Sequence, residues 1–470
     1  SSGSQTSCLC AFLQLSLCGI AAPMAFAKVV LSARSTPSPW KRLTPSAWRF
    51  ATAVAPGQHQ TPIVDALWQR RLEAKERART NMDSVPTKAQ GGRVLVAKPP
   101  SASASTVKYE FSDPQKAALR DKYRNPWGTF RVGRLFEDLD ALAGTVAYEH
   151  CRSENPNDED LHIVTASVDR IKYLHRANLK DDIVLYGKVT YVGKSSMEIR
   201  MTAVATWTDK PFMESYFTFV ARDPSTGKAA AINPLKVSGE EEERLFALGE
   251  QRTAQRKQHR EKIKNSALGK ALDKEGLAAA KELLSEAKTL MLMPTLAEQS
   301  EIMMSETSLQ NTLTAMPQHR NTAGKIFGGF LIRRAYELAN ATAYLFGGRR
   351  PVFHELDQVI FRSPVNVGDL LRLQSCVLYT SENIDQLGRA TVHVEVVADV
   401  LTPEKRQAVT SNIFNFTFGL AENSDGTGKS IHGGDIDLRR VVPTSLEESC
   451  RVIERYQADL EQLSEDLADQ

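Results

Sequence analysis

Residues 328–345 read GGFLIRRAYELANATAYL, and residues 132–146 read VGRLFEDLDALAGTV. Both stretches begin beside a glycine and continue with apolar residues three or four positions apart, which places these residues on one face of a helix. That face carries Leu135, Leu139, Leu142 and Val146 in one stretch and Leu331, Ala335, Leu338, Thr342 and Leu345 in the other. The sequence therefore predicts two long amphipathic helices built on the same pattern.

Strand patterns follow both predicted helices in the same order. A first strand is expected at 163–169 (IVTASVD) and at 355–361 (ELDQVIF). Residues 197–202 and 391–396 then alternate between apolar and polar, the period of two that is typical of half-buried antiparallel strands. Both series close on an aromatic strand, with Phe-Thr-Phe at 217–219 and at 416–418.

The separations between matching residues indicate an internal duplication. Gly133 and Gly329 are 196 residues apart, Asp169 and Asp357 are 188 apart, and the two Phe-Thr-Phe strands are 199 apart. Each copy is expected to be a helix followed by about four antiparallel strands, and the simplest packing wraps the sheet around the helix. Two such units can pair edge to edge, which hides two sheet edges. The predicted fold class is α+β.

Composition limits the class of protein. The chain has 470 residues, 42% hydrophobic and 24% charged, with a net charge of only +3, which argues against a dedicated nucleic-acid binder. No apolar run reaches the roughly 20 residues of a membrane span. The six cysteines show no CxxC spacing, so neither a disulfide framework nor a metal site such as zinc is expected.

The N-terminal stretch has the composition of a mitochondrial transit peptide. From Ser1 to Val64 the chain has no acid, five Lys or Arg residues and many Ser and Thr. Met24 is a plausible initiator. The expected location is the mitochondrion, in the matrix or associated with the inner membrane. A disordered leader without an address and a secretory signal are the alternatives.

The predicted organisation has six segments. These are a leader at 1–60, an N-terminal helix and loop at 61–107, a first repeat domain at 108–233, a helical linker at 234–306, a second repeat domain at 307–422, and a C-terminal tail and helix at 423–470. The linker contains a basic run, Arg252, Arg256, Lys257, Arg260, Lys262 and Lys264. We expect this run to be a solvated helix face, and phosphate binding is the alternative.

Several of these motifs resemble those of acyl-CoA thioesterases with tandem hotdog domains. Residues 319–329 (HRNTAGKIFGG) are similar to the segment that opens the helix in that family, and residues 163–169 and 193–199 are similar to its strands. The similarity covers roughly 108–420. It implies a double hotdog fold, a thioester hydrolase that releases CoA and a free fatty acid, and no cofactor, because coenzyme A is part of the substrate.

The resemblance implies one composite active site between the two repeats. Asp140, seven residues after Gly133, is its expected catalytic carboxylate, as general base or nucleophile. Asn321 from the second repeat is expected to position the carbonyl or the attacking water. Read alone, Asp140 could be an exposed helix acid and Asn321 a turn former.

Two glycines of the second repeat complete the expected site. Gly328 and Gly329 open the helix, where unsatisfied N–H groups and the helix dipole suit them to bind the thioester oxygen. Tight helix–sheet packing is a compatible alternative. A second site built from Asn125 and Glu337 is expected to be degraded, because Tyr336 stands at the position of Asp140.

Basic groups should meet the CoA phosphates. Lys194 and Arg362 are the candidates, and solvated surface charges are the alternative for both. His319 could carry a proton in a hotdog hydratase or dehydratase, but a structural role in its loop is favoured. A non-catalytic acyl-CoA-binding scaffold is the other alternative. The expected partners are acyl-CoA and further copies of the chain, with no nucleic acid, and the resemblance suggests a trimer of the tandem unit.

Overall fold

Two long helices occupy the positions of the repeated stretches. In this computed structural model α3 spans Val132–Cys151 and α6 spans Gly328–Gly347, as predicted. The helix α6 ends where Gly348 adopts a left-handed φ of 62° and donates its N–H to the carbonyl of Tyr344, a common helix ending. The structure describes residues 64–65, 69, 73 and 93–468, except 154–157, 159, 176, 208–209, 266–271, 294, 296–299, 322–323, 382–389 and 421–437.

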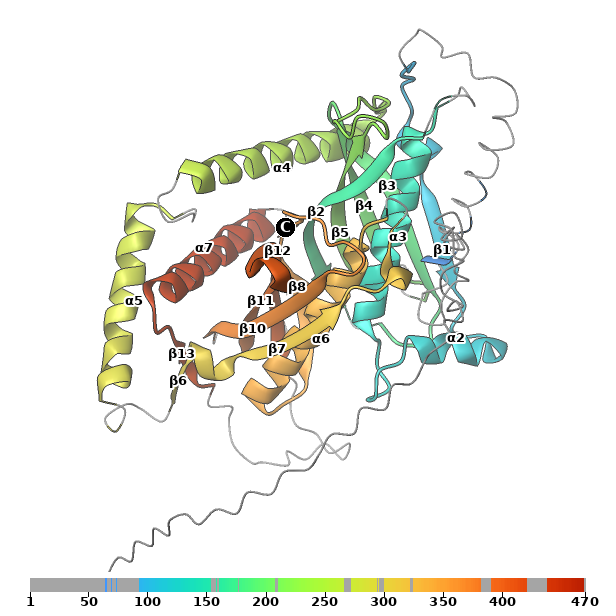
Figure 1. The fold of residues 1–470 in the computed structure, drawn as a ribbon. Helices are drawn as coiled ribbons and strands as arrows, with labels where there is room; N and C mark the ends of the chain where they lie inside the picture. Colours follow the sequence, from blue (N-terminus) through green and yellow to red (C-terminus); the bar gives the residue numbers. More distant parts are fainter. Residues whose placement is uncertain are drawn as a thin grey trace, which may run out of the picture. The chain divides into compact units, whose positions relative to one another are not determined.

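The described residues form one antiparallel sheet of eleven strands beside these helices, and its two halves have matching strand orders (Figure 1). The first half runs β1 (Ser105–Tyr109), β3 (Ile183–Val192), β4 (Ser196–Ala205), β5 (Pro211–Arg222) and β2 (His162–Tyr173). The second half continues with β8 (Pro351–Leu356), β12 (Gln407–Leu420), β11 (Thr391–Thr402), β10 (Leu370–Ser381) and β7 (Leu309–Thr314). A pseudo-twofold axis therefore passes between β2 and β8, and the predicted edge-to-edge pairing of two repeats is confirmed.

The junction between the halves is short. β2 pairs with β8 only at Ile171–Leu356 and Lys172–Glu355, and then with β9 (Val359–Ile360). The predicted single strand at 355–361 is therefore wrong, because the chain breaks between β8 and β9. The break lets Gln358 donate from Nε2 to Oδ1 of Asp169 at 2.7 Å, across the junction.

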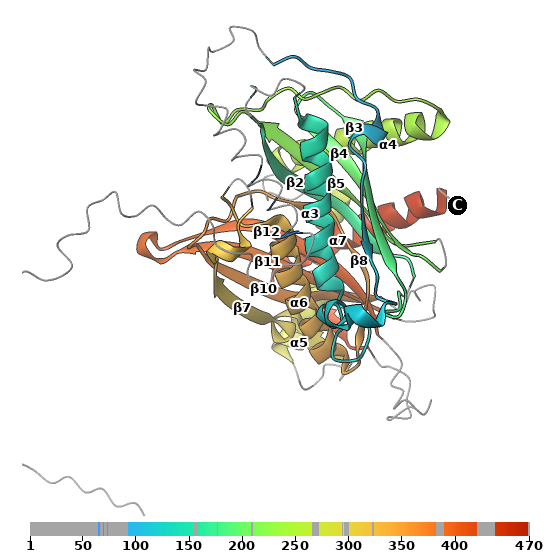
Figure 2. The same ribbon diagram turned by 90° about the vertical axis from the view of Figure 1, so that its right-hand side faces the viewer.

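The central helices lie side by side and pack on the same face of the sheet (Figure 2). Their apolar faces meet the inward side chains of the strands, such as Phe217 on β5 and Phe416 on β12, which are fully buried. This arrangement is the expected double hotdog. Burial of both helices follows from their sequences, since each apolar stripe needs a sheet to cover it.

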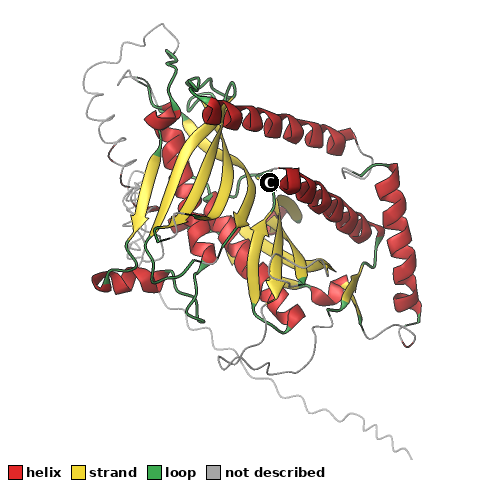
Figure 3. Ribbon diagram, turned by 180° about the vertical axis from the view of Figure 1, so that it is seen from behind, coloured by secondary structure: helices red, strands yellow, loops and turns green. Residues whose placement is uncertain are grey.

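Two further helices cover the opposite face of the sheet (Figure 3). They are α4 (Glu240–Asn265) and α7 (Leu446–Ala468), and they carry arginines at the same spacing. From α4, Arg252 bonds Glu198 at 2.6 Å and Arg256 bonds Asp169; from α7, Arg451 bonds Glu395 and Arg455 bonds Asp357. The expected solvated face is therefore wrong at Arg252 and Arg256, because these two arginines neutralise buried acids of the sheet.

The remaining described elements are smaller or peripheral. Helix α5 (Lys274–Leu292) packs on α7, α2 (Ala117–Lys122) precedes α3, and β6 (Glu301–Met303) pairs in parallel with β13 (Arg440–Val442). Within the described part of the chain, no helix is both long and apolar enough to cross a membrane. The predicted transit peptide and the tail at 423–437 lie outside the described residues.

Candidate active site

Asp140 lies at the contact between the two central helices. Its side chain is 1% exposed, although it carries a carboxylate. The N–H of Gly329 on α6 donates to Oδ2 at 2.6 Å, and the hydroxyl of Thr165 on β2 donates to Oδ1 at 3.1 Å. Burial raises the pKa of Asp140 to about 6, against the opposing effect of these two hydrogen bonds. A carboxylate with such a pKa suits proton transfer near neutral pH.

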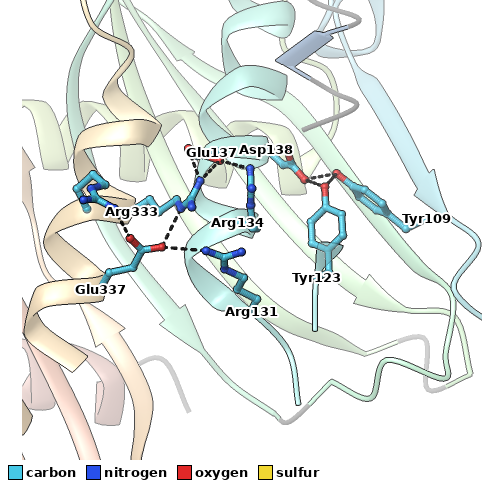
Figure 4. Close-up of polar contacts among 9 residues, drawn as sticks. Tyr109, Tyr123, Arg131, Arg134, Glu137, Asp138, Arg333 and Glu337 are labelled. Atoms are coloured by element: carbon cyan, nitrogen blue, oxygen red, sulfur yellow. Dashed lines mark hydrogen bonds and ion pairs between the residues drawn. The ribbon is translucent and has the colours of Figure 1, made fainter. Parts of the chain in front are cut away.

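The two neighbouring acids of α3 form hydrogen bonds or ion pairs with other side chains (Figure 4). Asp138 is fully buried and accepts hydrogen bonds from the hydroxyls of Tyr109 and Tyr123. Glu137 forms ion pairs with Arg333 and Arg134. Of the three acids between 137 and 140, Asp140 is therefore the one whose carboxylate accepts a hydrogen bond from the first turn of α6.

The two glycines that open α6 make room for the carboxylate. A Cβ atom on Gly328 would lie 3.0 Å from Oδ2 of Asp140 and 3.1 Å from Cζ of Phe361. A Cβ atom on Gly329 would lie 2.8 Å from Cα of Glu137, closer than real Cβ contacts. Residue 329 therefore requires glycine, whereas a methyl group at residue 328 would force the carboxylate or the ring to move by a few tenths of an ångström.

The N–H groups of the two glycines differ in their hydrogen bonds, so they are not both open to a substrate. The N–H of Gly329 is not an idle donor, because it is bonded to Asp140. Gly328 is the first residue of the helix, and none of the described residues accepts a hydrogen bond from its N–H. This N–H, with the positive end of the helix dipole, remains as a donor for a negatively charged oxygen.

Asn321 lies in the turn that leads into α6. Its Oδ1 accepts the N–H of Lys325 at 3.0 Å, and the turn closes where the N–H of Phe327 donates to the carbonyl of His319 at 2.9 Å. Asn125 makes the same bond in the first repeat, accepting the N–H of Thr129 at 2.9 Å. Both asparagines are thus turn formers, and this bond fixes the orientation of the Asn321 amide within the turn that precedes α6.

The pseudo-symmetric position carries two aromatic side chains in place of the carboxylate and the hydroxyl. Tyr336 takes the place of Asp140, and Phe353 takes the place of Thr165, since Phe353 pairs with Phe418 as Thr165 pairs with Phe219. The rings of Tyr336, which is half-buried, and Phe353, which is buried, are 5.5 Å apart. Glu337 instead bonds Arg333, Arg334 and Arg131 at 3.0, 2.9 and 3.2 Å. Within the described residues, aromatic packing and ion pairs thus occupy the second position, in line with the expected degradation.

The other residues predicted from the sequence lie in separate parts of the structure. Arg362 is exposed and follows Phe361, whose ring faces Gly328 and whose N–H donates to the carbonyl of Ala166. Lys194 is exposed in the turn between β3 and β4. It lines a separate cavity of about 320 Å³ with Leu95, Val192, Gly193, Ala231, Ile232, Pro234, Leu235 and Phe246. The ring of His319 stacks on Phe330 at 3.9 Å, which supports a structural role in its loop.

Sequence reasoning missed Thr165 and Phe361 as parts of the site. The signal for Thr165 was present, because the repeats change from Thr to Phe at 165 and 353 where they change from Asp to Tyr at 140 and 336. A paired change of this kind indicates that the two polar side chains act together. Phe361 gave no such signal, since its contact depends on the break between β8 and β9.

Several known proteins are similar in sequence to this chain over most of its length. The family model for the thioesterase superfamily matches residues 132–206, which include α3, β2, β3 and β4. The mitochondrial acyl-coenzyme A thioesterase 4 of Humulus lupulus is 39% identical over 88% of this chain and 76% of its own. The chloroplastic acyl-coenzyme A thioesterase 2 of the same plant is 38% identical over 88% and 92%.

A mammalian relative gives the same result over a shorter span. The mitochondrial acyl-coenzyme A thioesterase 9 of Mus musculus is 37% identical over 65% of this chain and 69% of its own. Since these identities extend over both repeats, and the two helices and their paired half-sheets have the hotdog arrangement, the chain belongs to the family of acyl-CoA thioesterases.

Proposed function

We propose that the chain hydrolyses acyl-CoA to a free fatty acid and CoA at one composite site. The single observation that carries the proposal is the buried Asp140 of the first repeat, bonded to the N–H of Gly329 of the second. Its pKa of about 6 keeps it ionised at neutral pH and close enough to neutrality to accept a proton. The family of the relatives supports thioester hydrolysis as the reaction.

In the proposed mechanism Asp140 is the general base. It removes a proton from a water molecule, whose oxygen forms a bond to the thioester carbon as the carbonyl electrons move to oxygen. The N–H of Gly328 and the amide of Asn321 stabilise that oxyanion. The intermediate collapses, the carbon–sulfur bond breaks, and the proton on Asp140 passes to the leaving thiolate. Thr165 keeps the carboxylate oriented throughout.

A separate experiment distinguishes a general base from a nucleophile at Asp140. A nucleophilic Asp140 would form a mixed anhydride with the acyl group, which would add the acyl mass to the protein. Rapid quench of a single turnover followed by mass spectrometry should show no such adduct. An acyl adduct on the peptide that contains Asp140 would replace the base mechanism with covalent catalysis.

A thiol-release assay tests the reaction itself. Purified protein should release free thiol from acyl-CoA substrates, and a series of chain lengths gives its preference. Addition of water to an enoyl-CoA without thiol release would indicate a hydratase. Binding of acyl-CoA without turnover would indicate a scaffold. Either of these two outcomes would overturn the proposed function.

Three further features belong to the same proposal. Arg362, which follows Phe361 beside Gly328, and Lys194, at its own cavity by the turn between β3 and β4, bind CoA phosphates, so neutral substitutions should raise KM for acyl-CoA more than they lower kcat. The acid-free N-terminal stretch directs the chain to mitochondria. Two relatives named as mitochondrial support this proposal, and a fusion of residues 1–60 to a fluorescent protein tests it.

The tandem unit forms a homo-oligomer, which we expect to be a trimer. Analytical ultracentrifugation of the purified protein tests this expectation.

A further inference from the structure

An ion pair crosses between the repeats beside the proposed site (Figure 4). The guanidinium of Arg333 on α6 donates from Nη1 to both carboxylate oxygens of Glu137 on α3, at 3.1 and 3.2 Å. The side chain of Glu137 is only 8% exposed and that of Arg333 only 13%. A charge-assisted pair that contacts both oxygens and is largely shielded from water holds its two elements in a defined geometry.

The pair exists because the two halves have diverged. Glu137 lies four residues after Gly133, and Arg333 lies four residues after Gly329, so the two side chains occupy equivalent positions. Their contact therefore spans the pseudo-twofold axis. A dimer of identical units would bring two like side chains together there. The duplicated chain instead places an acid opposite a base, which turns a repulsive contact into an attractive one.

The same two residues lie about one helical turn from the two residues that form the hydrogen bond between Gly329 and Asp140. Arg333 is one helical turn after Gly329, and Glu137 is about one turn before Asp140. The backbone of Glu137 is also what a Cβ atom on Gly329 would strike, at 2.8 Å. The ion pair and the hydrogen bond between Gly329 and Asp140 are thus neighbouring links between the same two rigid helices. Movement of α6 along or away from α3 would stretch both.

We propose that the Glu137–Arg333 ion pair is a positioning device of the active site, which sets the crossing of α3 and α6 so that the Gly329 N–H stays against Asp140. The proposal rests on the proposed function, because Asp140 must be the catalytic carboxylate for the position of Gly329 to affect turnover. Neither Glu137 nor Arg333 takes part in the chemistry.

The effect can be read from the titration of Asp140. The N–H of Gly329 and the hydroxyl of Thr165 are the groups that lower its pKa against burial. The neighbouring acids on the same helix are held in their own contacts, Glu137 by arginines and Asp138 by two tyrosines. Loss of the Gly329 bond should therefore raise the pKa of Asp140 rather than alter a different group.

The experiment compares Arg333→Gln, the double variant Glu137→Gln/Arg333→Gln, and Arg131→Gln in the full-length protein. Arg131 is the matched control, because it also bridges the repeats, to Glu337 at 3.2 Å, but lies on the side of the degraded position. In Arg333→Gln and in the control alike, Glu337 loses one of its three arginines. The double variant leaves neither Glu137 nor Arg333 as an unpaired buried charge.

The readout is kcat/KM for one acyl-CoA from pH 5 to pH 9, with 4,4′-dithiodipyridine to detect thiol at acidic pH. In both Arg333 variants we expect the acid limb to move up by about one pH unit, which lowers kcat/KM about fivefold at pH 6 and about twofold at pH 7. In Arg131→Gln the limb should stay in place. Arg333→Lys, which keeps the charge but cannot bond Glu137 and Glu337 from two fixed nitrogens at once, should give a smaller shift.

Three outcomes would overturn the proposal. The first is an unmoved acid limb in folded Arg333→Gln and in the folded double variant. The second is an equal shift in the Arg131 control. The third is recovery of only unfolded protein from all the Arg333 variants, which would make the pair a folding determinant alone. Full activity of Asp140→Asn is a separate result, which would remove the proposed function itself.

Discussion

Replacement of Asp140 by Asn should abolish activity and stabilise the protein at the same time. Asn has nearly the shape of Asp, and both hydrogen bonds can persist. Its amide oxygen can accept the N–H of Gly329, and its amide NH2 can donate to the hydroxyl of Thr165. The substitution therefore removes a buried charge and little else.

The magnitude follows from the pKa of Asp140, which burial raises from its ordinary value of 3.8 to about 6. Between these values the folded state holds a proton that the unfolded state has lost, so the stability of the wild-type protein falls as pH rises through this window. Above the window the buried charge costs about 3 kcal/mol. Asp140→Asn avoids this cost, so its advantage should grow from about 1 kcal/mol at pH 4.5 to about 3 kcal/mol at pH 7.5.

Two measurements check this prediction. Denaturant unfolding of both proteins at pH 4.5 and pH 7.5 gives the stability difference, and thiol release gives kcat. Loss of the base should lower kcat by about 100-fold or more. Asp138→Asn is the matched control for activity, because Asp138 is a buried acid of the same helix that contacts tyrosines instead. A variant at Asp140 that is no more stable than wild type at pH 7.5, or that keeps more than about a tenth of kcat, would refute the reasoning.

Three further substitutions test separate parts of the site. Thr165→Val removes the donor to Oδ1 of Asp140, so the acid limb of kcat/KM should rise by about half a pH unit or more, and Thr165→Ser should restore it. Gly328→Ala places a methyl group 3.0 Å from that carboxylate and 3.1 Å from the ring of Phe361, so kcat should fall about tenfold or more while thermal unfolding changes little. Glu337→Gln should leave kcat within about twofold, because Glu337 lies at the degraded position; a loss as large as that of Asp140→Asn would show that one site per chain is the wrong assignment.

Local pattern was enough to predict the elements of each repeat. The apolar spacing after Gly133 and Gly329 gave two helices with the observed starts, and the period of two gave strands that the sheet contains. The strand at 355–361 was predicted as continuous because its composition has no breaker. Its division into β8 and β9 depends on contacts with β2, which belongs to the other repeat. Pairing across the junction therefore overrode local preference.

The charged linker shows the same limit. The basic run of α4 looks like a solvated face, because arginines and lysines alternate without a strong apolar stripe. Arg256 is nevertheless buried against Asp169, an acid 87 residues earlier in the chain. No local rule identifies which charge of a helix will meet a buried acid, since this depends on how the helix docks.

The sequence by itself determined the duplication, the two helices and the alternating strands, and it nominated Asp140, Gly328 and Gly329 as candidates for the site. These follow from spacing, turn chemistry and family motifs, which are properties of neighbouring residues. Only the tertiary structure decided that the Gly329 N–H bonds Asp140, that Thr165 shares that carboxylate, and that Lys194 lines a separate cavity. The physical reason is that Asp140 and Gly329 are 189 residues apart and meet only when two helices pack across the pseudo-twofold axis.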